Sequence, residues 1–341
     1  MRDPAFWWRS PSWMSWLLAP AGLLYGTISG RRMLQAGRRA RLPVICVGNY
    51  SLGGAGKTPT VIALLRLLRA AGETPVVVSR GYGGRLTGPV NVDAARHTAE
   101  DVGDEPLLLA RLAPVIVSSD RVQGSGAAVS VGASVVVLDD GFQNPSLVKD
   151  LSLIVIDANR GIGNGAVFPS GPLRAPLAAQ VDRTDALLVV GDGTAAADIT
   201  AQVEGRGRPV LRAHIVPDSQ AIAALRERRV SAFAGIGDPQ RFFATLRASG
   251  IDVQSTRVFA DHHRFTAPEI RRLGDEARAD GLTLVTTEKD FVRLSGLEKA
   301  DTAIIHPFPI TLVFDDEARV RDFITTRLAE ARKQIAATTV L

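Results

Sequence analysis

The chain has 341 residues, of which 46% are hydrophobic and 22% charged. A chain of this length and composition can bury one large or two ordinary hydrophobic cores, which excludes an intrinsically disordered protein. Its single cysteine, Cys46, lies in the apolar run from Pro43 to Val47, which excludes a disulfide framework and a cysteine metal site and fits a reducing cytoplasm. The formal net charge of +5 suits nucleic acid, anionic lipid or a phosphorylated substrate, and does not choose among them.

The N-terminus combines aromatic, apolar and basic residues. The apolar run from Leu17 to Ile28 is interrupted by Pro20 and followed by a cluster of arginines. Aromatic and basic residues around such a run are typical of a helix on a membrane surface, whereas a crossing helix needs about 20 mostly apolar residues. Asp3 argues against a secretory signal, whose first segment is basic. We therefore predict an interfacial helix over residues 1–35, and the alternative is a helix whose aromatic side chains pack on the protein body. All four tryptophans belong to this segment: Trp7, Trp8, Trp13 and Trp16.

Short β-branched runs alternate with helical stretches along the rest of the chain. This alternation predicts an α/β fold with a mostly parallel sheet. The pattern restarts after the stretch from Gly205 to Pro209, which predicts a second, smaller α/β domain. We expect a P-loop core over residues 36–207 and a C-terminal domain over residues 208–341. The expected strands are Val44–Val47, Pro75–Ser79, Val115–Ser118, Val135–Leu138, Leu153–Ile156, Leu187–Val190, Val210–Ile215, Val230–Ala234 and Thr283–Thr287.

A glycine-rich loop separates the first expected strand from an expected helix over Pro59 to Ala71. Glycines let backbone N–H groups converge on phosphate oxygens, and the start of a helix adds a favourable dipole. A lysine and a threonine at the end of such a loop bind the β- and γ-phosphates and Mg²⁺. The first glycine of the strict motif is replaced by serine, yet the strand before and the helix after argue against an ordinary flexible loop. The expected nucleotide-binding residues are Ser51, Leu52, Gly53, Gly54, Ala55, Gly56, Lys57 and Thr58.

The run from Val135 to Leu138 ends in two carboxylates, Asp139 and Asp140. Carboxylates at this place in a P-loop protein hold Mg²⁺ directly or through water. Aspartate is also common in the turn after a strand, so this feature gains its weight from the glycine loop. Together the two motifs predict an Mg²⁺ATP site in which Thr58, Asp139 and Asp140 are the metal residues.

A kinase also needs a group near the acceptor hydroxyl that receives its proton. One candidate is the acidic loop from Asp101 to Pro106, whose carboxylates are equally suited to capping the following helix. The other is the triplet Asp261-His262-His263. Two adjacent histidines on a strand would point in opposite directions, which disfavours a metal shared between them. The residues alone leave this choice open.

Several blocks, in one order and over most of the chain, resemble the tetraacyldisaccharide 4′-kinases, which phosphorylate the 4′ position of the lipid A precursor in Gram-negative bacteria. The blocks are Gly48-Asn49, Gly53-Gly54-Ala55-Gly56-Lys57-Thr58-Pro59, Ser79-Arg80-Gly81-Tyr82-Gly83, Val102-Gly103-Asp104-Glu105-Pro106, Asp120-Arg121, Asp139-Asp140-Gly141-Phe142-Gln143, Pro169-Ser170-Gly171-Pro172-Leu173-Arg174, Asp261-His262-His263 and Thr286-Thr287-Glu288-Lys289-Asp290.

The resemblance implies roles for four further side chains. Asp104 corresponds to the family's catalytic base, and His262 to the imidazole that assists it from the other domain. Arg121 corresponds to a phosphate or transition-state contact, and Gln143 to a residue that positions Mg²⁺ or the nucleotide. The implied reaction transfers the γ-phosphate of Mg²⁺ATP to the 4′-hydroxyl of a tetraacyldisaccharide 1-phosphate, giving lipid IVA. The implied partners are this lipid and the cytoplasmic face of the inner membrane, bound peripherally, and no nucleic acid.

Two departures from the family pattern and two alternative functions accompany this interpretation. Asn144 stands where the family has His, and Ala175 where it has Glu, which puts in doubt any contact of those two side chains. A nucleotide-switched ATPase is disfavoured because Leu52 stands where its loop carries lysine. A GTPase is disfavoured because Lys289 and Asp290 are adjacent, whereas the guanine motif separates them. A P-loop kinase of a soluble metabolite stays open as the other alternative.

Overall fold

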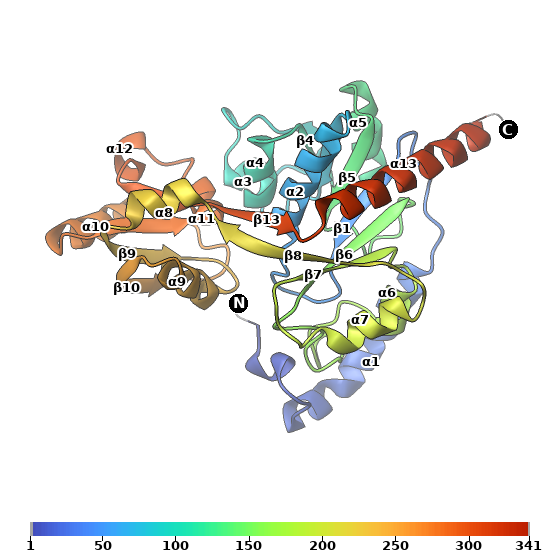
Figure 1. Cartoon of the computed structure of the whole chain (residues 1–341), viewed down its shortest axis with the longest axis horizontal. Coiled ribbons are helices and arrows are strands. Elements are labelled where there is room, and N and C mark those ends of the chain that lie inside the picture. Colours follow the sequence, from blue (N-terminus) through green and yellow to red (C-terminus); the bar gives the residue numbers. More distant parts are fainter. Residues whose placement is uncertain (1–2, 340–341) are drawn as a thin grey trace.

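Two β-sheets flanked by helices organise the chain in this computed structural model, which describes residues 3–339 (Figure 1). The larger sheet has nine strands in the order β13-β8-β7-β6-β1-β5-β2-β4-β3, and the smaller has four in the order β10-β9-β11-β12. Neighbouring strands are parallel except in two edge pairs of the larger sheet, β13 with β8 and β3 with β4. The predicted α/β fold, with a mostly parallel sheet and a second, smaller α/β unit, is confirmed.

The central strands of the larger sheet are mostly aliphatic, because helices cover both faces and leave no solvent-facing side. Every residue of β1, β5, β6 and β7 is buried. The strands of the larger sheet are Val44–Gly48 (β1), Pro75–Ser79 (β2), Val90–Asn91 (β3), Val115–Val117 (β4), Val135–Asp139 (β5), Leu151–Asp157 (β6), Ala186–Val190 (β7), Val210–Pro217 (β8) and Ile310–Phe314 (β13). Those of the smaller sheet are Arg229–Ala234 (β9), Asp252–Val258 (β10), Thr283–Thr287 (β11) and Ile305–Phe308 (β12).

Helices α2, α4 and α13 contribute apolar side chains to the core on one face of the larger sheet, and α5, α6 and α7 to the core on the other. The helix α2 begins at Lys57, two residues before the predicted start. The helices of this unit are Ala5–Trp8 (η1, a 3₁₀ helix), Trp13–Met33 (α1), Lys57–Ala70 (α2), Ala99–Val102 (α3), Asp104–Ala110 (α4), Arg121–Ser130 (α5), Leu177–Val181 (α6), Ala197–Glu204 (α7) and Glu317–Thr339 (α13).

The smaller unit, residues 219–308, leaves the larger sheet after β8 and returns to it at β13. Figure 1 shows it at the left, joined to the main body through these two strands. Its helices are Ser219–Leu225 (α8), Pro239–Ala248 (α9), Ala267–Ala279 (α10), Glu288–Arg293 (α11) and Lys299–Thr302 (α12). The predicted domain boundary after residue 207 stays a prediction. Strands on the two sides of this boundary, β7 and β8, pair in one sheet. Strand β8 pairs with β7 because Leu211 and Ala213 belong to the core of the larger sheet.

The helix α1 turns small side chains toward the body and large apolar ones away from it. A Cβ on Gly22 would lie 3.0 Å from the Val167 carbonyl oxygen, so a side chain here would require neighbouring atoms to shift. Trp7 is buried and donates a hydrogen bond from Nε1 to the Pro169 carbonyl, 3.0 Å away. The exposed apolar residues of α1 are Trp13, Met14, Trp16, Leu17, Leu23, Leu24, Tyr25 and Ile28.

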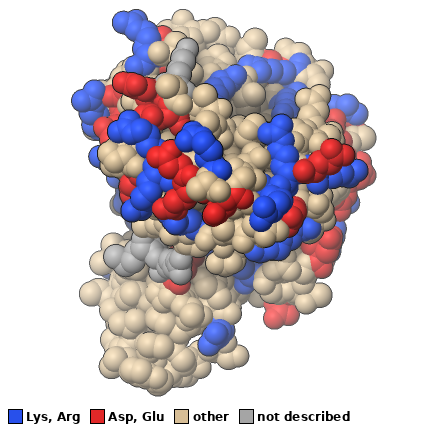
Figure 2. Space-filling model, turned by 90° about the vertical axis from the view of Figure 1, so that its left-hand side faces the viewer, with Lys and Arg blue, Asp and Glu red and all other residues tan. Residues whose placement is uncertain are grey.

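On the face that Figure 2 shows, the lower lobe of the molecule, where α1 lies, carries few charged side chains compared with the body above it. Among residues 3–339, no helix combines the length and the hydropathy needed to cross a bilayer. The predicted membrane association of this helix stays a prediction.

Candidate active site

The loop between β1 and α2 presents unpaired backbone donors. Gly53 and Gly56 have φ of 95° and 91°, which favour glycine. Within residues 3–339, no acceptor takes a hydrogen bond from the N–H groups of Gly53, Gly54, Ala55 or Gly56. The loop therefore offers several unpaired N–H groups beside the start of a helix, and phosphates accept hydrogen bonds from donors of this kind.

The first two residues of the loop serve its shape. The Ser51 carbonyl accepts hydrogen bonds from Asn49 Nδ2 at 2.7 Å and from Arg174 Nε at 3.0 Å. The Leu52 N–H donates to the Pro172 carbonyl at 2.8 Å. These bonds tie the loop to the segment around Arg174. The Ser51 carbonyl and the Leu52 N–H are therefore already hydrogen-bonded within the protein.

Lys57 and Asp140 face each other below the loop. Lys57 Nζ lies 3.1 Å from Asn49 Oδ1 and 3.7 Å from Asp140 Oδ2. Burial lowers the pKa of Lys57, and the Asp140 charge opposes this shift. Arg174 holds the Asp140 carboxylate with two hydrogen bonds, of 2.7 and 3.1 Å, a bidentate geometry of high specificity. Asp140 has a left-handed φ of 53°, which turns it out of the strand direction toward Arg174.

Asp139, the last residue of β5, is a carboxyl group without a full set of partners. Its Oδ2 accepts a 3.3 Å hydrogen bond from Ser79, while its buried Oδ1 has no partner in the described part of the chain. Burial and the charges of Glu105 and Asp140 raise the pKa of Asp139 to about 7. A carboxylate so placed lacks a cation, and a hard divalent ion such as Mg²⁺ prefers this kind of ligand. The residues present therefore fit a nucleotide with Mg²⁺.

Asp104, at the start of α4, is held from the smaller unit. His262 Nδ1 lies 3.1 Å from Asp104 Oδ2, and Arg293 donates to the same oxygen through Nε at 2.7 Å and also through Nη2. Burial alone would raise the pKa of Asp104, but the His262 hydrogen bond and the charges of Lys289 and Arg293 outweigh it, so the pKa lies well below its usual range. Asp104 is therefore an ionised, oriented carboxylate at neutral pH.

Arg293 is almost fully buried, with 5% of its side chain exposed. It also donates to the Gly235 carbonyl and to Asp290 Oδ1, each at 2.6 Å. A buried guanidinium surrounded by acceptors on both units fixes the position of Asp104.

Glu105 joins Asp104 to the nucleotide loop. Its Oε1 accepts a hydrogen bond from Lys289 Nζ at 2.9 Å and a longer one from Thr58 Oγ1 at 3.4 Å. Because Glu105 follows Asp104 directly, these contacts place the candidate base next to the threonine at the start of α2. The loop, the carboxylate pair and the base therefore form one site.

Arg121 and Gln143 lie at the same edge of the sheet but differ in their partners. Arg121 is buried and donates to the Ser118 carbonyl at 2.8 Å, and its Nε has no partner among the residues described. Gln143 donates to the Asn49 carbonyl at 2.7 Å and to Gln180 Oε1 at 2.9 Å. Arg121 thus keeps a free donor, whereas the Gln143 amide is hydrogen-bonded to Asn49, the residue that precedes the loop by two positions.

Comparison with known proteins places the chain in a family. Residues 14–329 match the family model described as tetraacyldisaccharide-1-P 4′-kinase. The proteins named tetraacyldisaccharide 4′-kinase from Nitrobacter winogradskyi and Rhodopseudomonas palustris are 60% and 59% identical over 335 and 332 residues, which is 98% and 97% of this chain and 99% and 98% of theirs. The chain belongs to the tetraacyldisaccharide-1-P 4′-kinase family. The resemblance predicted from the sequence is confirmed.

A solved structure of this family has the same fold. The crystal structure of LpxK from Aquifex aeolicus in complex with ATP is 28% identical to this chain, with a TM-score of 0.71, and the match covers 92% of this chain and 99% of that one. The two proteins therefore share a fold over almost their whole length.

The two departures from the family pattern occupy structural positions. Asn144 Oδ1 accepts from the Ser146 N–H at 2.9 Å, and its carbonyl accepts from Lys149. Ala175 is fully buried in the core below α6, where its carbonyl accepts from Gln180 Nε2 at 2.8 Å. Neither residue makes a hydrogen bond to the candidate active-site side chains in the described chain.

Several residues of the site had no individual role in the sequence-based prediction: Asn49, Glu105, Arg174, Lys289 and Arg293. Glu105 and Lys289 lie inside blocks that carry the family resemblance, and this was an available signal for them. Arg293 lies outside those blocks, one helical turn after Asp290, and nothing in the sequence pairs it with Asp104. The third member of the triplet, His263, stacks on Phe259 and contacts Glu269 at 3.2 Å. It lies in a turn rather than on the strand we assumed.

Proposed function

We propose that this chain is an ATP-dependent kinase that transfers the γ-phosphate to the 4′-hydroxyl of a tetraacyldisaccharide 1-phosphate, giving lipid IVA. The observation that carries this proposal is the convergence of Asp104, His262 and Arg293 beside a nucleotide loop, in a member of the tetraacyldisaccharide-1-P 4′-kinase family. A switch ATPase needs no such base, because its attacking group is water and its output is a conformational change.

The nucleotide side of the site supplies positive charge and a metal ligand. When bound, Mg²⁺ATP supplies the γ-phosphoryl group and a divalent charge that neutralises its oxygens. We assign Lys57 and Arg121 to the phosphates, because both are shielded cations close enough to feel the charges of the carboxylate pair. Asp139 and Thr58 would hold the metal ion, whereas Asp140 pairs with Lys57 and with Arg174, which donates to the loop carbonyl of Ser51. Fixed charges of this kind act on the transition state without reorganisation.

On the acceptor side, Asp104 orients the sugar hydroxyl and receives its proton. A carboxylate with a low pKa is a weak base, but phosphoryl transfer through a loose transition state builds little charge on the attacking oxygen. Orientation therefore matters more than basicity at this site. His262 shares the Asp104 oxygen, and in the tautomer protonated on Nδ1 it donates to that oxygen and leaves Nε2 as an acceptor.

We infer that the protein acts on the cytoplasmic face of the inner membrane. An acyl-chain acceptor resides in a lipid phase, and α1 presents a row of exposed apolar side chains on a lobe that carries few charges. Large apolar residues that face outward, while glycines pack inward, invert the usual pattern of a surface helix. Such a patch marks a lipid or protein interaction surface.

The test is phosphate transfer in mixed micelles that contain ATP, Mg²⁺ and a tetraacyldisaccharide 1-phosphate. The expected product carries a second phosphate, at the 4′ position, and forms only when enzyme, metal and ATP are all present. Matched reactions contain a soluble aminosugar phosphate, or no acceptor. Equal transfer to the soluble sugar would favour the soluble-metabolite kinase, and ATP hydrolysis without any phosphorylated acceptor would favour the switch ATPase.

A further inference from the structure

The segment before α1 reaches the phosphate loop. A Cβ on Gly53 would lie 2.7 Å from Asp3 Oδ2, so the Asp3 carboxylate rests directly on the loop. The same oxygen lies 3.7 Å from Arg160 Nη1. Burial and the nearby charge of Asp261 raise the pKa of Asp3, and Arg160 opposes this shift. An acidic side chain thus lies against the loop and beside the Arg160 guanidinium.

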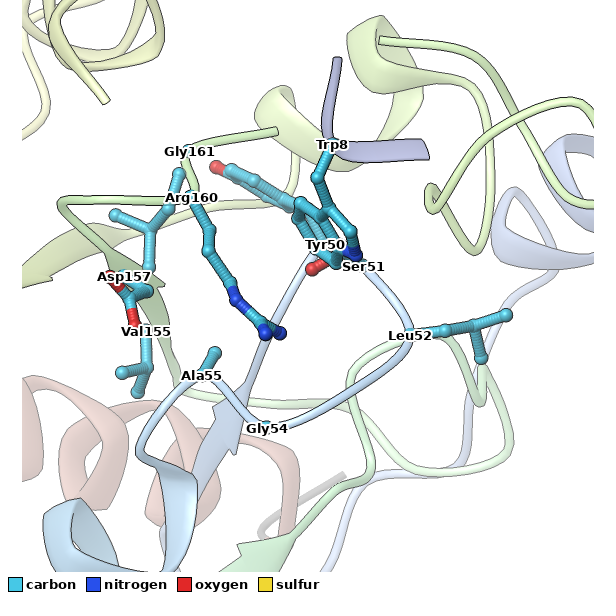
Figure 3. A pocket seen from close by; sticks show the side chains of 11 residues that line it. Trp8, Tyr50, Ser51, Leu52, Gly54, Ala55, Val155, Asp157, Arg160 and Gly161 are labelled. Atoms are coloured by element: carbon cyan, nitrogen blue, oxygen red, sulfur yellow. The ribbon is translucent and has the colours of Figure 1, made fainter. Parts of the chain in front are cut away.

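Arg160, in the turn after β6, is the positively charged residue beside Asp3. Its guanidinium lies 4.9 Å from the centre of the Trp8 ring and donates to Asp238 Oδ2 at 2.9 Å. Stacking on an aromatic face restricts the direction of the guanidinium fork. Figure 3 shows the guanidinium pointing toward the part of the loop between Leu52 and Ala55.

Trp8 adds a second donor. Its indole Nε1 is shielded from solvent, and no hydrogen bond of normal geometry satisfies it in residues 3–339, although the indole is close enough to Asp3 to lower the pKa of that carboxyl. In Figure 3 the indole and the Arg160 guanidinium border the same small pocket. A shielded donor without an acceptor costs free energy unless a ligand satisfies it. Two donors beside a glycine loop are the complement of an anion.

We propose that Arg160 and the Trp8 indole form an anion subsite for the phosphate monoester of the acceptor headgroup, which Asp3 occupies until the acceptor binds. This inference depends on the proposed function. Arg160 follows β6, whereas Asp139 ends β5, and β1 lies between these two strands. Lys57 and Thr58 contact Asp140 and Glu105, on the β5 side. Trp8 also belongs to the segment that leads into the apolar helix α1, so a lipid held at α1 would extend its headgroup past Arg160. The phosphate of the acceptor, rather than that of the nucleotide, fits this position.

The experiment compares two lipid disaccharides that differ only in the 1-phosphate, with the full-length enzyme in mixed micelles. Arg160→Gln is expected to raise KM for the phosphorylated acceptor by about 10- to 100-fold, and to leave KM unchanged for ATP and for the acceptor without phosphate. Trp8→Phe, which keeps the ring but removes the donor, is expected to raise the same KM by about 3- to 10-fold. Asp3→Asn is expected to lower it, because a competing anion is lost, and a misfolded variant would not produce this gain.

A matched control separates the subsite from the contact between the two units. Asp238→Asn removes the ion pair with Arg160 and keeps an N-cap residue on α9, and it should leave KM for ATP and for the acceptor without phosphate unchanged. If Arg160→Gln weakened both acceptors equally, or raised KM for ATP, the anion subsite would be wrong while the kinase assignment stood. A wild-type enzyme inactive on both acceptors would contradict the proposed function and the subsite with it.

Discussion

His262 Nδ1 lies 3.1 Å from Asp104 Oδ2, although 158 positions separate the two residues in the chain. Asp104 begins a helix of the main body, and His262 lies in a turn of the smaller unit, with a left-handed φ of 56°. The candidate base and its partner therefore meet only when the two units are packed together. A change that separates the two units therefore removes the contacts of Asp104 with His262 and Arg293.

Replacement of His262 tests the half of the site contributed by the smaller unit. We expect His262→Ala to lower kcat by about 10- to 100-fold, because Asp104 loses one donor but stays bound to Arg293. Steady-state kinetics should show this loss with KM for ATP unchanged. His263→Ala is the matched control, since His263 contacts Glu269 and Phe259 instead. Equal effects of the two replacements would contradict a specific role for His262.

Arg293 should govern the pH dependence of the base. Asp104 acts in its ionised form, and the surrounding positive charges hold its pKa well below the usual range, so the wild-type kcat/KM should show no acid limb from this group near neutrality. Arg293→Gln removes a charge and leaves burial to raise the pKa. The acid limb of the kcat/KM profile should then move to higher pH. If kcat/KM of the variant were lower at every pH but kept the same pH dependence, Arg293 would have only a structural role.

Asp139 and Asp140 should separate in their dependence on Mg²⁺. Asp139 has an oxygen without a partner, whereas Asp140 is held by Arg174 and Lys57. We expect Asp139→Asn to raise the Mg²⁺ concentration for half-maximal rate by at least about 10-fold. Asp140→Asn should chiefly raise KM for ATP, because Lys57 and Arg174 lose the carboxylate charge that holds them beside the loop. Titrations of rate against Mg²⁺ and ATP distinguish the two, and the reverse pattern would exchange their roles.

The exposed face of α1 should bind lipid. Trp16 and Leu23 are 72% and 73% exposed, and burial of one such side chain contributes about 1.5–3 kcal/mol. Trp16→Ser combined with Leu23→Ser should therefore lower co-sedimentation with phosphatidylglycerol-containing vesicles by more than about 10-fold. Leu112→Ser, at an exposed site before β4, is the control. Undiminished sedimentation of the double variant would contradict the interfacial role of α1.

Much of the architecture was predictable because it is local. The aliphatic strands, the glycine loop and the carboxylates after β5 each carry their own pattern, and the carboxyl ends of parallel strands necessarily share one edge of the sheet. The family resemblance added Asp104 and His262, which the physical pattern alone could not separate from a helix cap and a surface pair.

The rest depended on contacts between distant segments. No periodicity predicts that β13 returns to pair with β8, that Arg293 reaches across to Asp104, or that Asp3 rests on Gly53. Gln143 shows the same limit, since its partner Gln180 lies 37 positions away. Side chains that act across an interface have no sequence spacing to reveal them.

The most direct test of the account is single-turnover transfer of the γ-phosphate to the lipid disaccharide 1-phosphate by Asp104→Asn, with ATP affinity measured on the same preparation. We predict a rate about 10²- to 10⁴-fold below wild type at an unchanged Kd for ATP, because Asp104 touches the acceptor and not the nucleotide. A thermal unfolding curve on that preparation shows whether loss of the buried pair with Arg293 has disrupted the fold. A folded Asp104→Asn enzyme that transfers phosphate at the wild-type rate would contradict the assignment of Asp104 as the base.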